Sequence, residues 1–145
     1  MKGKERREVI VNQNLWIFVC THGRFGEELI KSAEMIAGEV ENVYSFSLLP
    51  GMDPEEYASM LRAKLEIAPS QVLCLVDLFG GTPCNICASL SKDYDVHLLS
   101  GVNLSMYIEL TSQKNNYSIE ELLEMGVDTL KDSGKNVIDV LNQRK

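Results

Sequence analysis

The amino-terminal part of the chain has no long apolar run. The longest one there, LWIFVC at residues 15–20, is six residues long. This run is too short to cross a membrane, and no small-residue cleavage pattern of a signal peptide accompanies it. Basic residues are also few, with 14 Lys and Arg against 21 Asp and Glu, so the formal net charge is −7. Such a chain would be repelled by nucleic-acid phosphates. We therefore expect a cytoplasmic protein that binds no nucleic acid.

Cysteine and histidine are scarce. The four cysteines lie in or beside apolar stretches, and without an export signal they are expected to be buried free thiols: Cys20, Cys74, Cys84 and Cys87. No second pair of ligands stands at a spacing that suits zinc, so no metal site is expected. The sequence also has no GxxxxGK[ST] and no GxGxxG. A nucleotide-binding loop is therefore unsupported, no cofactor is expected, and any phosphate donor would have to be another protein.

The length and composition suit one domain. A chain of 145 residues with 45% hydrophobic residues can bury one real core and is too short for two comfortable ones. The first 14 residues carry four basic and two acidic side chains and look like a polar extension outside the core. We expect a polar extension at 1–14 and a single domain at 15–145.

Strand and helix patterns alternate along this domain. Buried strands are expected at 15–20, 42–49, 72–76 and 95–101, each followed by a helical pattern. The first helix has Leu29, Ile30, Ala33, Ile36 and Ala37 on one face and ends at Gly38. The later helices start at Asp53 with a capping box, at Thr82 with Pro83 at the first helical position, at 102, and at Ser118 with a capping box. A last run, NVIDVL at 136–141, is read as a terminal edge strand. This order predicts a doubly wound, mostly parallel α/β sheet with helices on both faces.

Two residues whose side chains can take part in catalysis follow buried strands of this sheet. His22 comes after the first strand in THGRFG, and Asp77 ends the third in VLCLVDLFGG. Right-handed crossovers bring the carboxyl ends of all parallel strands to one edge, where open α/β sheets bind ligands. We therefore expect His22 and Asp77 to be neighbours. His97 lies within a strand pattern and is interpreted as structural.

The residue types in this set suit a phosphohistidine. A carboxylate that accepts the proton of one ring nitrogen leaves the other nitrogen free as a nucleophile and stabilises positive charge on the ring. Gly80, Gly81 and Thr82 form a turn that opens a helix, where free backbone N–H groups and the Thr82 hydroxyl would receive phosphoryl oxygens. The catalytic residues expected are His22 and Asp77, with these three as the phosphoryl-binding turn.

Cys84 and Cys87 offer a rival interpretation. A CxxC at a helix start after a strand is where thiol–disulfide redox pairs lie, because the helix dipole lowers the pKa of the first thiol. The turn GGTPCNIC lacks an aromatic residue before Cys84, and helical spacing would bury Cys87 against Leu90. Both facts favour packing over redox chemistry, and the redox alternative is kept as the lesser one.

Taken together, four motifs resemble the IIA components of the mannose class of the bacterial phosphoenolpyruvate-dependent sugar phosphotransferase system. The motifs are THGRFGEELIKSAEMIAGEVENV, LLPGMDPEEY, LVDLFGGTPCN and LLSGVNLSM, in the family's order. The resemblance implies that His22 is phosphorylated, that Asp77 is its hydrogen-bonding partner, and that Thr82 and the adjoining backbone bind the phosphoryl group. It also implies a fold with a C-terminal antiparallel strand near 136–141.

The same resemblance implies partners. The donor would be the histidine-containing phosphocarrier protein and the acceptor a histidine of a separate IIB component, with only indirect association with the membrane subunits IIC and IID. Family members are homodimers, so a homodimer is expected. They commonly carry an aromatic and a small residue where this chain has Cys84 and Cys87. A related carrier, the phosphoryl-carrier subunit of a dihydroxyacetone kinase, shares the fold and an N-terminal active histidine and remains the alternative.

Overall fold

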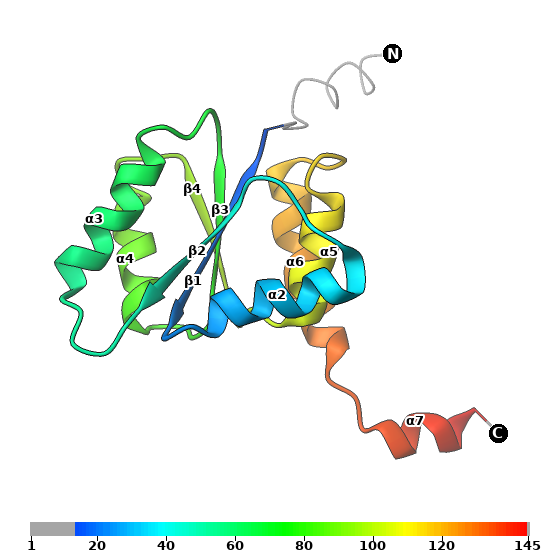
Figure 1. Ribbon diagram of the computed structural model, residues 1–145. Coiled ribbons are helices and arrows are strands. Elements are labelled where there is room, and N and C mark those ends of the chain that lie inside the picture. Colours follow the sequence, from blue (N-terminus) through cyan, green and yellow to red (C-terminus); the bar gives the residue numbers. More distant parts are fainter. Residues whose placement is uncertain (1–13, 145) are drawn as a thin grey trace, which may run out of the picture.

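Four parallel strands form the central sheet of the computed structural model, which describes residues 14–144 (Figure 1). The strands are β1 (Trp16–His22), β2 (Val43–Leu48), β3 (Val72–Val76) and β4 (Val96–Ser100). Their spatial order is β2-β1-β3-β4, and all three neighbouring pairs are parallel. The predicted strands of the parallel sheet are therefore confirmed. The expected polar extension at 1–14 lies, apart from Asn14, outside the described residues.

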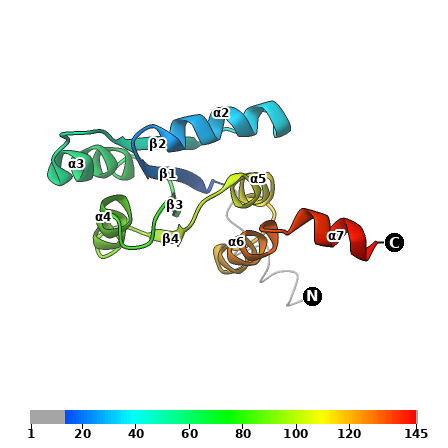
Figure 2. The same ribbon diagram turned by 90° about the horizontal axis from the view of Figure 1, so that it is seen from below.

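Helices cover both faces of this sheet. They are α2 (Phe25–Ala37), α3 (Pro54–Leu65), α4 (Thr82–Leu90), α5 (Leu104–Gln113), α6 (Ile119–Ser133) and α7 (Val137–Gln143). Figures 1 and 2 show α3 and α4 on one face and α2, α5 and α6 on the other. This placement follows from right-handed crossovers, because chain that moves toward β2 and chain that moves toward β4 must cross on opposite faces. The doubly wound architecture is confirmed.

Helix starts follow the local capping signals. Asp53 and Ser118 each form the predicted capping box, with Glu56 and Glu121 as the reciprocal acids. The start of α4 differs by one residue from the prediction. Gly81 is the N-cap and Thr82 is already helical, so the Thr82 hydroxyl makes no capping hydrogen bond.

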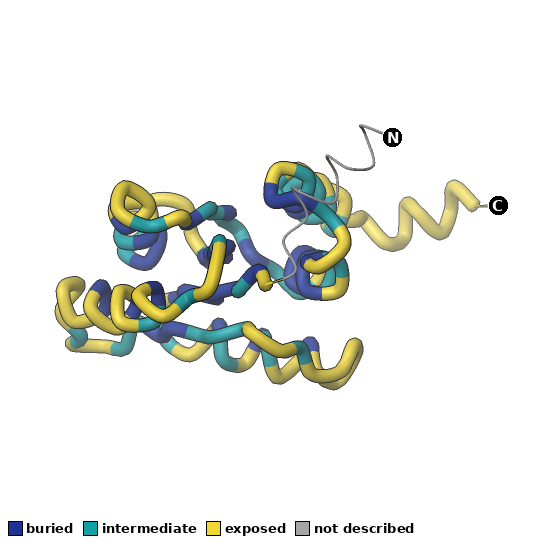
Figure 3. Tube along the Cα trace, turned by 90° about the horizontal axis from the view of Figure 1, so that it is seen from above, coloured by how far each residue is buried: buried dark blue, intermediate teal, exposed yellow. Residues whose placement is uncertain are grey.

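Two apolar clusters fill the space between the sheet and the helices. Figure 3 shows buried positions along the central strands. All five residues of β3 are buried, as expected for a central parallel strand covered on both faces. Leu29 and Ala33 of α2 are buried, as predicted, but Ile36 is 67% exposed and Ala37 is exposed as well. The prediction for Ile36 and Ala37 is wrong because the last turn of α2 extends past the residues that cover its first turns.

The predicted C-terminal antiparallel strand is also wrong, because residues 137–143 form the helix α7. The Asn136 side chain accepts a hydrogen bond from the Asp139 N–H at 3.3 Å and caps this helix. Strand order β2-β1-β3-β4 leaves the segment unpaired within the described chain, so its backbone forms local hydrogen bonds instead. Figures 1 and 2 show α7 extending away from the sheet. None of its residues is buried.

Candidate functional site

The carboxyl ends of β1 and β3 meet at the switch point of the sheet. After β1 the chain crosses through α2 to β2 on one side, and after β3 it crosses through α4 to β4 on the other. Loops that leave adjacent strands in opposite directions open a crevice between them, where ligands bind in folds of this kind. His22 is the last residue of β1 and Asp77 directly follows β3. The topology therefore places both at this crevice.

A single carboxylate oxygen holds His22 at two points. Asp77 Oδ2 lies 3.0 Å from the backbone nitrogen of His22 and 3.0 Å from its ring atom Nδ1. An ionised carboxylate only accepts hydrogen bonds, so Nδ1 carries the ring proton and Nε2 keeps its lone pair. The His22 side chain is 46% exposed, against 17% for Asp77. Within residues 14–144 the other oxygen, Oδ1, is buried without a hydrogen-bond partner, so the contacts of the carboxylate converge on His22.

Polar contacts fix the loop that follows His22. Thr21, which is fully buried, accepts a hydrogen bond from the Gly26 N–H at 2.8 Å and thereby satisfies a donor at the start of α2. At the next residue, Glu27, the side-chain Oε2 accepts a hydrogen bond from the Ser47 hydroxyl of β2 at 2.6 Å. This hydrogen bond is the main reason why the pKa of Glu27 is lowered from its ordinary value. The loop after β1 is thus tied to β1 itself and to β2.

The glycine turn packs directly against the imidazole ring. A Cβ on Gly81 would lie 2.7 Å from His22 Cε1 and 3.4 Å from Nε2, so only glycine lets the ring face this turn. The prediction that the Gly81 N–H is free is wrong, because this group donates to the Leu78 carbonyl at 3.2 Å. In the described chain the N–H groups of Gly80 and Thr82 have no acceptor. The turn that packs against the ring therefore has two N–H groups without an acceptor within residues 14–144, beside the Thr82 hydroxyl. Sequence reasoning missed the steric role of Gly81.

The four cysteines are all buried free thiols, as predicted. Cys87 does not form a sulfur pair with Cys84. Its Sγ lies within 4.8 Å of those of Cys20 and Cys74, which come from β1 and β3. Burial and the neighbouring thiols raise the pKa of Cys20, whereas hydrogen bonds from Cys20 and Cys74 lower the pKa of Cys87. Sequence spacing missed this cluster because its strand members are far apart in the chain and adjacent only in the sheet.

His97 lies away from the crevice. It is the second residue of β4, near the amino end of that strand, and its Nε2 is 3.1 Å from Asp95 Oδ1. The carboxyl ends of the parallel strands, where His22 lies, are at the opposite edge of the sheet. His97 therefore takes no part in the candidate site.

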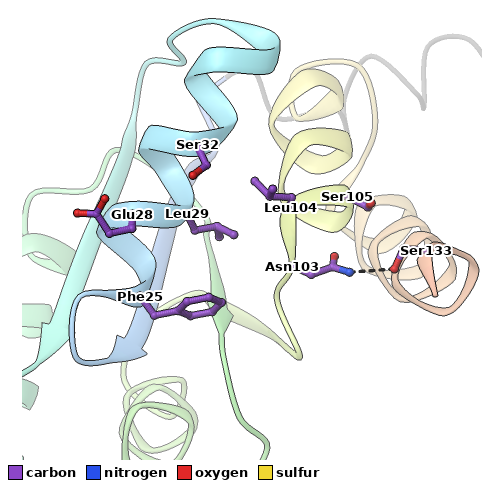
Figure 4. Close-up of a pocket in the computed structure, with 8 residues that line it drawn as sticks. All are labelled: Phe25, Glu28, Leu29, Ser32, Asn103, Leu104, Ser105 and Ser133. Atoms are coloured by element: carbon purple, nitrogen blue, oxygen red, sulfur yellow. Dashed lines mark hydrogen bonds between the residues drawn. The ribbon is translucent and has the colours of Figure 1, made fainter. Parts of the chain in front are cut away.

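A groove of about 470 Å³ runs between α2 and α5, starting at Phe25, three residues after His22 (Figure 4). Figure 4 shows Phe25 and Leu29 on the α2 side and Asn103, which donates to Ser133 Oγ at 2.8 Å, on the other. His22 and Asp77 do not line this groove. The imidazole is instead on an open surface between α2 and the glycine turn.

Large apolar side chains are exposed on the loops around this surface. Phe25 is 48% exposed, Leu78 59% and Phe79 85%. Leu78 and Phe79 immediately follow Asp77, and Phe25 begins the helix after His22. Apolar side chains around an open polar site suit a protein partner more than a small enclosed ligand.

The fold and this geometry define a doubly wound α/β protein with a carboxylate-held histidine at its switch point. The chain belongs to the mannose-type EIIA family, whose model, described as "PTS system fructose IIA component", matches residues 16–127. Over 119 residues it is 37% identical to the mannose-specific EIIAB component of the phosphotransferase system (PTS) of Escherichia coli strain K12. That match covers 78% of this chain and 36% of the relative, so the chain spans about a third of that protein's length.

Other relatives match over most of their own length. The PTS fructose-specific EIIA component of Bacillus subtilis strain 168 is 32% identical over 110 residues, which cover 74% of this chain and 75% of the relative. Among solved structures, an EIIA component from Streptococcus agalactiae superposes with a TM-score of 0.81 at 28% identity and covers 86% of this chain and 98% of its own. A mannose/sorbose-specific IIA subunit from Enterococcus faecalis gives 0.78 at 28% identity, with 85% and 94% covered. Within residues 14–144 no helix is both long enough and apolar enough to span a bilayer.

Proposed function

We propose that this chain is a phosphocarrier of a sugar phosphotransferase system and that His22 is its phosphorylated residue. It takes the phosphoryl group from the histidine-containing phosphocarrier protein and passes it to a IIB component. The observation that supports this most is the double contact of Asp77 Oδ2 with the backbone and Nδ1 of His22. This contact leaves Nε2 as the nucleophile.

The reaction exchanges one phosphorus–nitrogen bond for another. The lone pair of His22 Nε2 attacks phosphorus, the bond to the donor's histidine breaks, and that ring recovers its electron pair. Positive charge develops on the His22 ring, and the Asp77 carboxylate stabilises it. The N–H groups of Gly80 and Thr82 and the Thr82 hydroxyl bind the phosphoryl oxygens at the start of α4. Gly81 leaves room for the ring beside them.

The surroundings of His22 fit protein partners. The exposed apolar side chains Phe25, Leu78 and Phe79 give a docking surface for the donor and for the IIB acceptor. Both partners would be cytoplasmic proteins, so this chain works there and associates with the membrane subunits IIC and IID only indirectly. A single EIIA domain at 15–145, acting as a homodimer, carries the reaction. The relatives named above are all sugar-system components, which favours this function over the dihydroxyacetone kinase and redox alternatives.

The test is reconstitution with phosphoenolpyruvate labelled in its phosphate, the general energy-coupling proteins and this chain. We expect label that is stable in base and lost in acid, as for a phosphoramidate, and that maps to His22. His22→Gln should accept no label. The matched control His97→Gln should accept it at the wild-type rate, because His97 lies at the other edge of the sheet. Labelling by ATP alone, or a base-labile aspartyl phosphate, would contradict the proposal.

A further inference from the structure

Three sulfur atoms from three different elements meet beneath the candidate site. Cys20 lies in β1, Cys74 in β3 and Cys87 in α4, and their Sγ atoms all lie within 4.8 Å of one another. The parallel register pairs Phe18 with Cys74 and Cys20 with Val76, so Cys20 and Cys74 point to the same face of the sheet. Cys87 meets them from the helix that packs on that face.

This cluster is closed to solvent and surrounded by apolar side chains. Its three residues are at most 1% exposed and belong to the core between the sheet and α3 and α4. The nearby Tyr57 hydroxyl donates to the Phe46 carbonyl at 2.7 Å and is thus already engaged. In the described part of the chain no His, Asp, Glu or fourth Cys joins the three sulfurs.

The number of ligands in the cluster limits which atom it can bind. Structural zinc sites are closed with four protein ligands, and this cluster has three. A pyramidal centre bonded to three thiolates at about 2.3 Å, the length of a zinc–thiolate bond, holds the sulfurs about 3.4 Å apart. Since the sulfurs lie at most 4.8 Å apart, the cluster has to contract by no more than about 1.4 Å to bind an atom of that size in a three-coordinate arrangement.

Burial of the cluster limits the net charge that the three thiolates and a bound centre can carry together. Three thiolates around a monovalent ion leave a net charge of about −2, and around a divalent ion about −1, and neither charge has a partner in these apolar surroundings. Three thiolates around a trivalent centre are neutral. Soft thiolate ligands also prefer soft centres. The occupant that satisfies coordination, charge and softness together is a trivalent metalloid.

We propose that Cys20, Cys74 and Cys87 form a three-thiolate binding site for trivalent arsenic, supplied as arsenite. Arsenous acid exchanges its three hydroxyl groups for the three sulfurs. Three As–O and three S–H bonds break, three As–S bonds form, and three molecules of water leave with the thiol protons. Neither arsenic nor sulfur changes oxidation state, so the step needs no oxidant or reductant.

Arsenic bound to the three sulfurs should perturb the crevice that holds His22 and Asp77. In β1, Cys20 lies two residues before His22. In β3, Cys74 lies three residues before Asp77, which directly follows that strand. Cys87 lies in α4, the helix that begins at the glycine turn. Contraction of the cluster pulls on all three elements, so the ring resonances of His22 should shift. This readout needs no phosphoryl transfer and therefore does not depend on the proposed function.

The experiment adds sodium arsenite to the reduced wild-type protein and measures the intact mass under native conditions. We expect one arsenic per chain with the loss of three protons, which counts three sulfur bonds. Loss of two protons with a hydroxyl retained would mean a two-thiol adduct, and absence of an adduct would mean no site; either result overturns the proposal.

A matched pair of variants on α4 locates the adduct. Cys87→Ala should weaken arsenite binding at least tenfold, whereas Cys84→Ala, which removes a buried thiol outside the cluster, should bind like the wild type. Fluorescence of Trp16, the only tryptophan, checks that each variant is folded. If Cys87→Ala does not fold, Cys74→Ala replaces it. Loss of binding in Cys84→Ala with retention in Cys87→Ala would refute the assignment of the three thiols.

Discussion

Gly81→Ala should slow phosphoryl transfer while leaving the fold intact. Gly81 is the N-cap of α4 with φ −76°, a value that alanine adopts without strain. Alanine is a poorer N-cap than glycine, but it also reduces the entropy of the unfolded chain. The two effects oppose each other, so the free energy of unfolding should change by less than about 1 kcal/mol.

The effect on phosphoryl transfer is larger, because the methyl group of alanine would clash with the imidazole ring of His22. Its Cβ would lie 2.7 Å from His22 Cε1, whereas ordinary contact begins at 3.4 Å, so the ring has to move by about 0.7 Å. Misplacing a reacting group by about 1 Å costs about 100-fold in rate. We therefore expect transfer to His22 to slow by about 10- to 100-fold, or about 1.4 to 2.7 kcal/mol of barrier.

Quenched-flow measurement of phosphorylation by the phosphorylated carrier gives this rate, and NMR of the two histidine rings reports whether His22 has moved. Gly134→Ala is the matched control, since its φ is −88° and its Cβ would meet nothing within 4 Å. It should match the wild type in rate and stability. A wild-type rate in Gly81→Ala, with unchanged His22 resonances, would refute the argument that the turn needs glycine to seat the ring.

The remaining predictions concern the carboxylates and the quaternary structure. Asp77→Asn should keep the fold and still bind the carrier but slow transfer more than tenfold, over about 1.4 kcal/mol of barrier, because an amide cannot stabilise charge on the ring of His22; wild-type rates would show that Asp77 is only structural. Ser47→Ala removes the hydroxyl that lowers the pKa of Glu27, so the pKa of this carboxyl should rise toward its ordinary value in an NMR titration. The stability that ionised Glu27 contributes is present above the ordinary glutamate pKa and is lost as pH falls through the lowered value, so the variant should be less stable than the wild type near neutral pH and the difference should shrink in acid; a difference that does not change with pH would contradict this. The apolar side chains exposed on α7 predict a homodimer, with a light-scattering mass of about twice the 16.2 kDa of one chain, and Val140→Asp should yield the monomer, whereas a monomeric wild type would refute the dimer.

Local patterns were enough to predict most of the secondary structure. The strand β3 is a continuous apolar run, the other strands are mostly apolar, and capping residues such as Asp53 and Ser118 act on backbone groups within three residues of themselves. Both signals depend only on residues close together in the chain, so they can be recognised from the sequence. The same reasoning failed for residues 136–141, because apolar content alone does not distinguish a short strand from a helix when pairing depends on a distant edge.

Sequence alone also determined that His22 and Asp77 lie at the carboxyl ends of buried strands, because crossover handedness brings all such ends to one edge of the sheet. Only the tertiary structure decided that one oxygen of Asp77 contacts both the backbone and Nδ1 of His22, and that a side chain on Gly81 would collide with the ring. It likewise decided that Cys87 meets Cys20 and Cys74 and not Cys84. These are contacts between residues far apart in the chain, and their distances depend on strand order, register and helix docking, which no local pattern encodes.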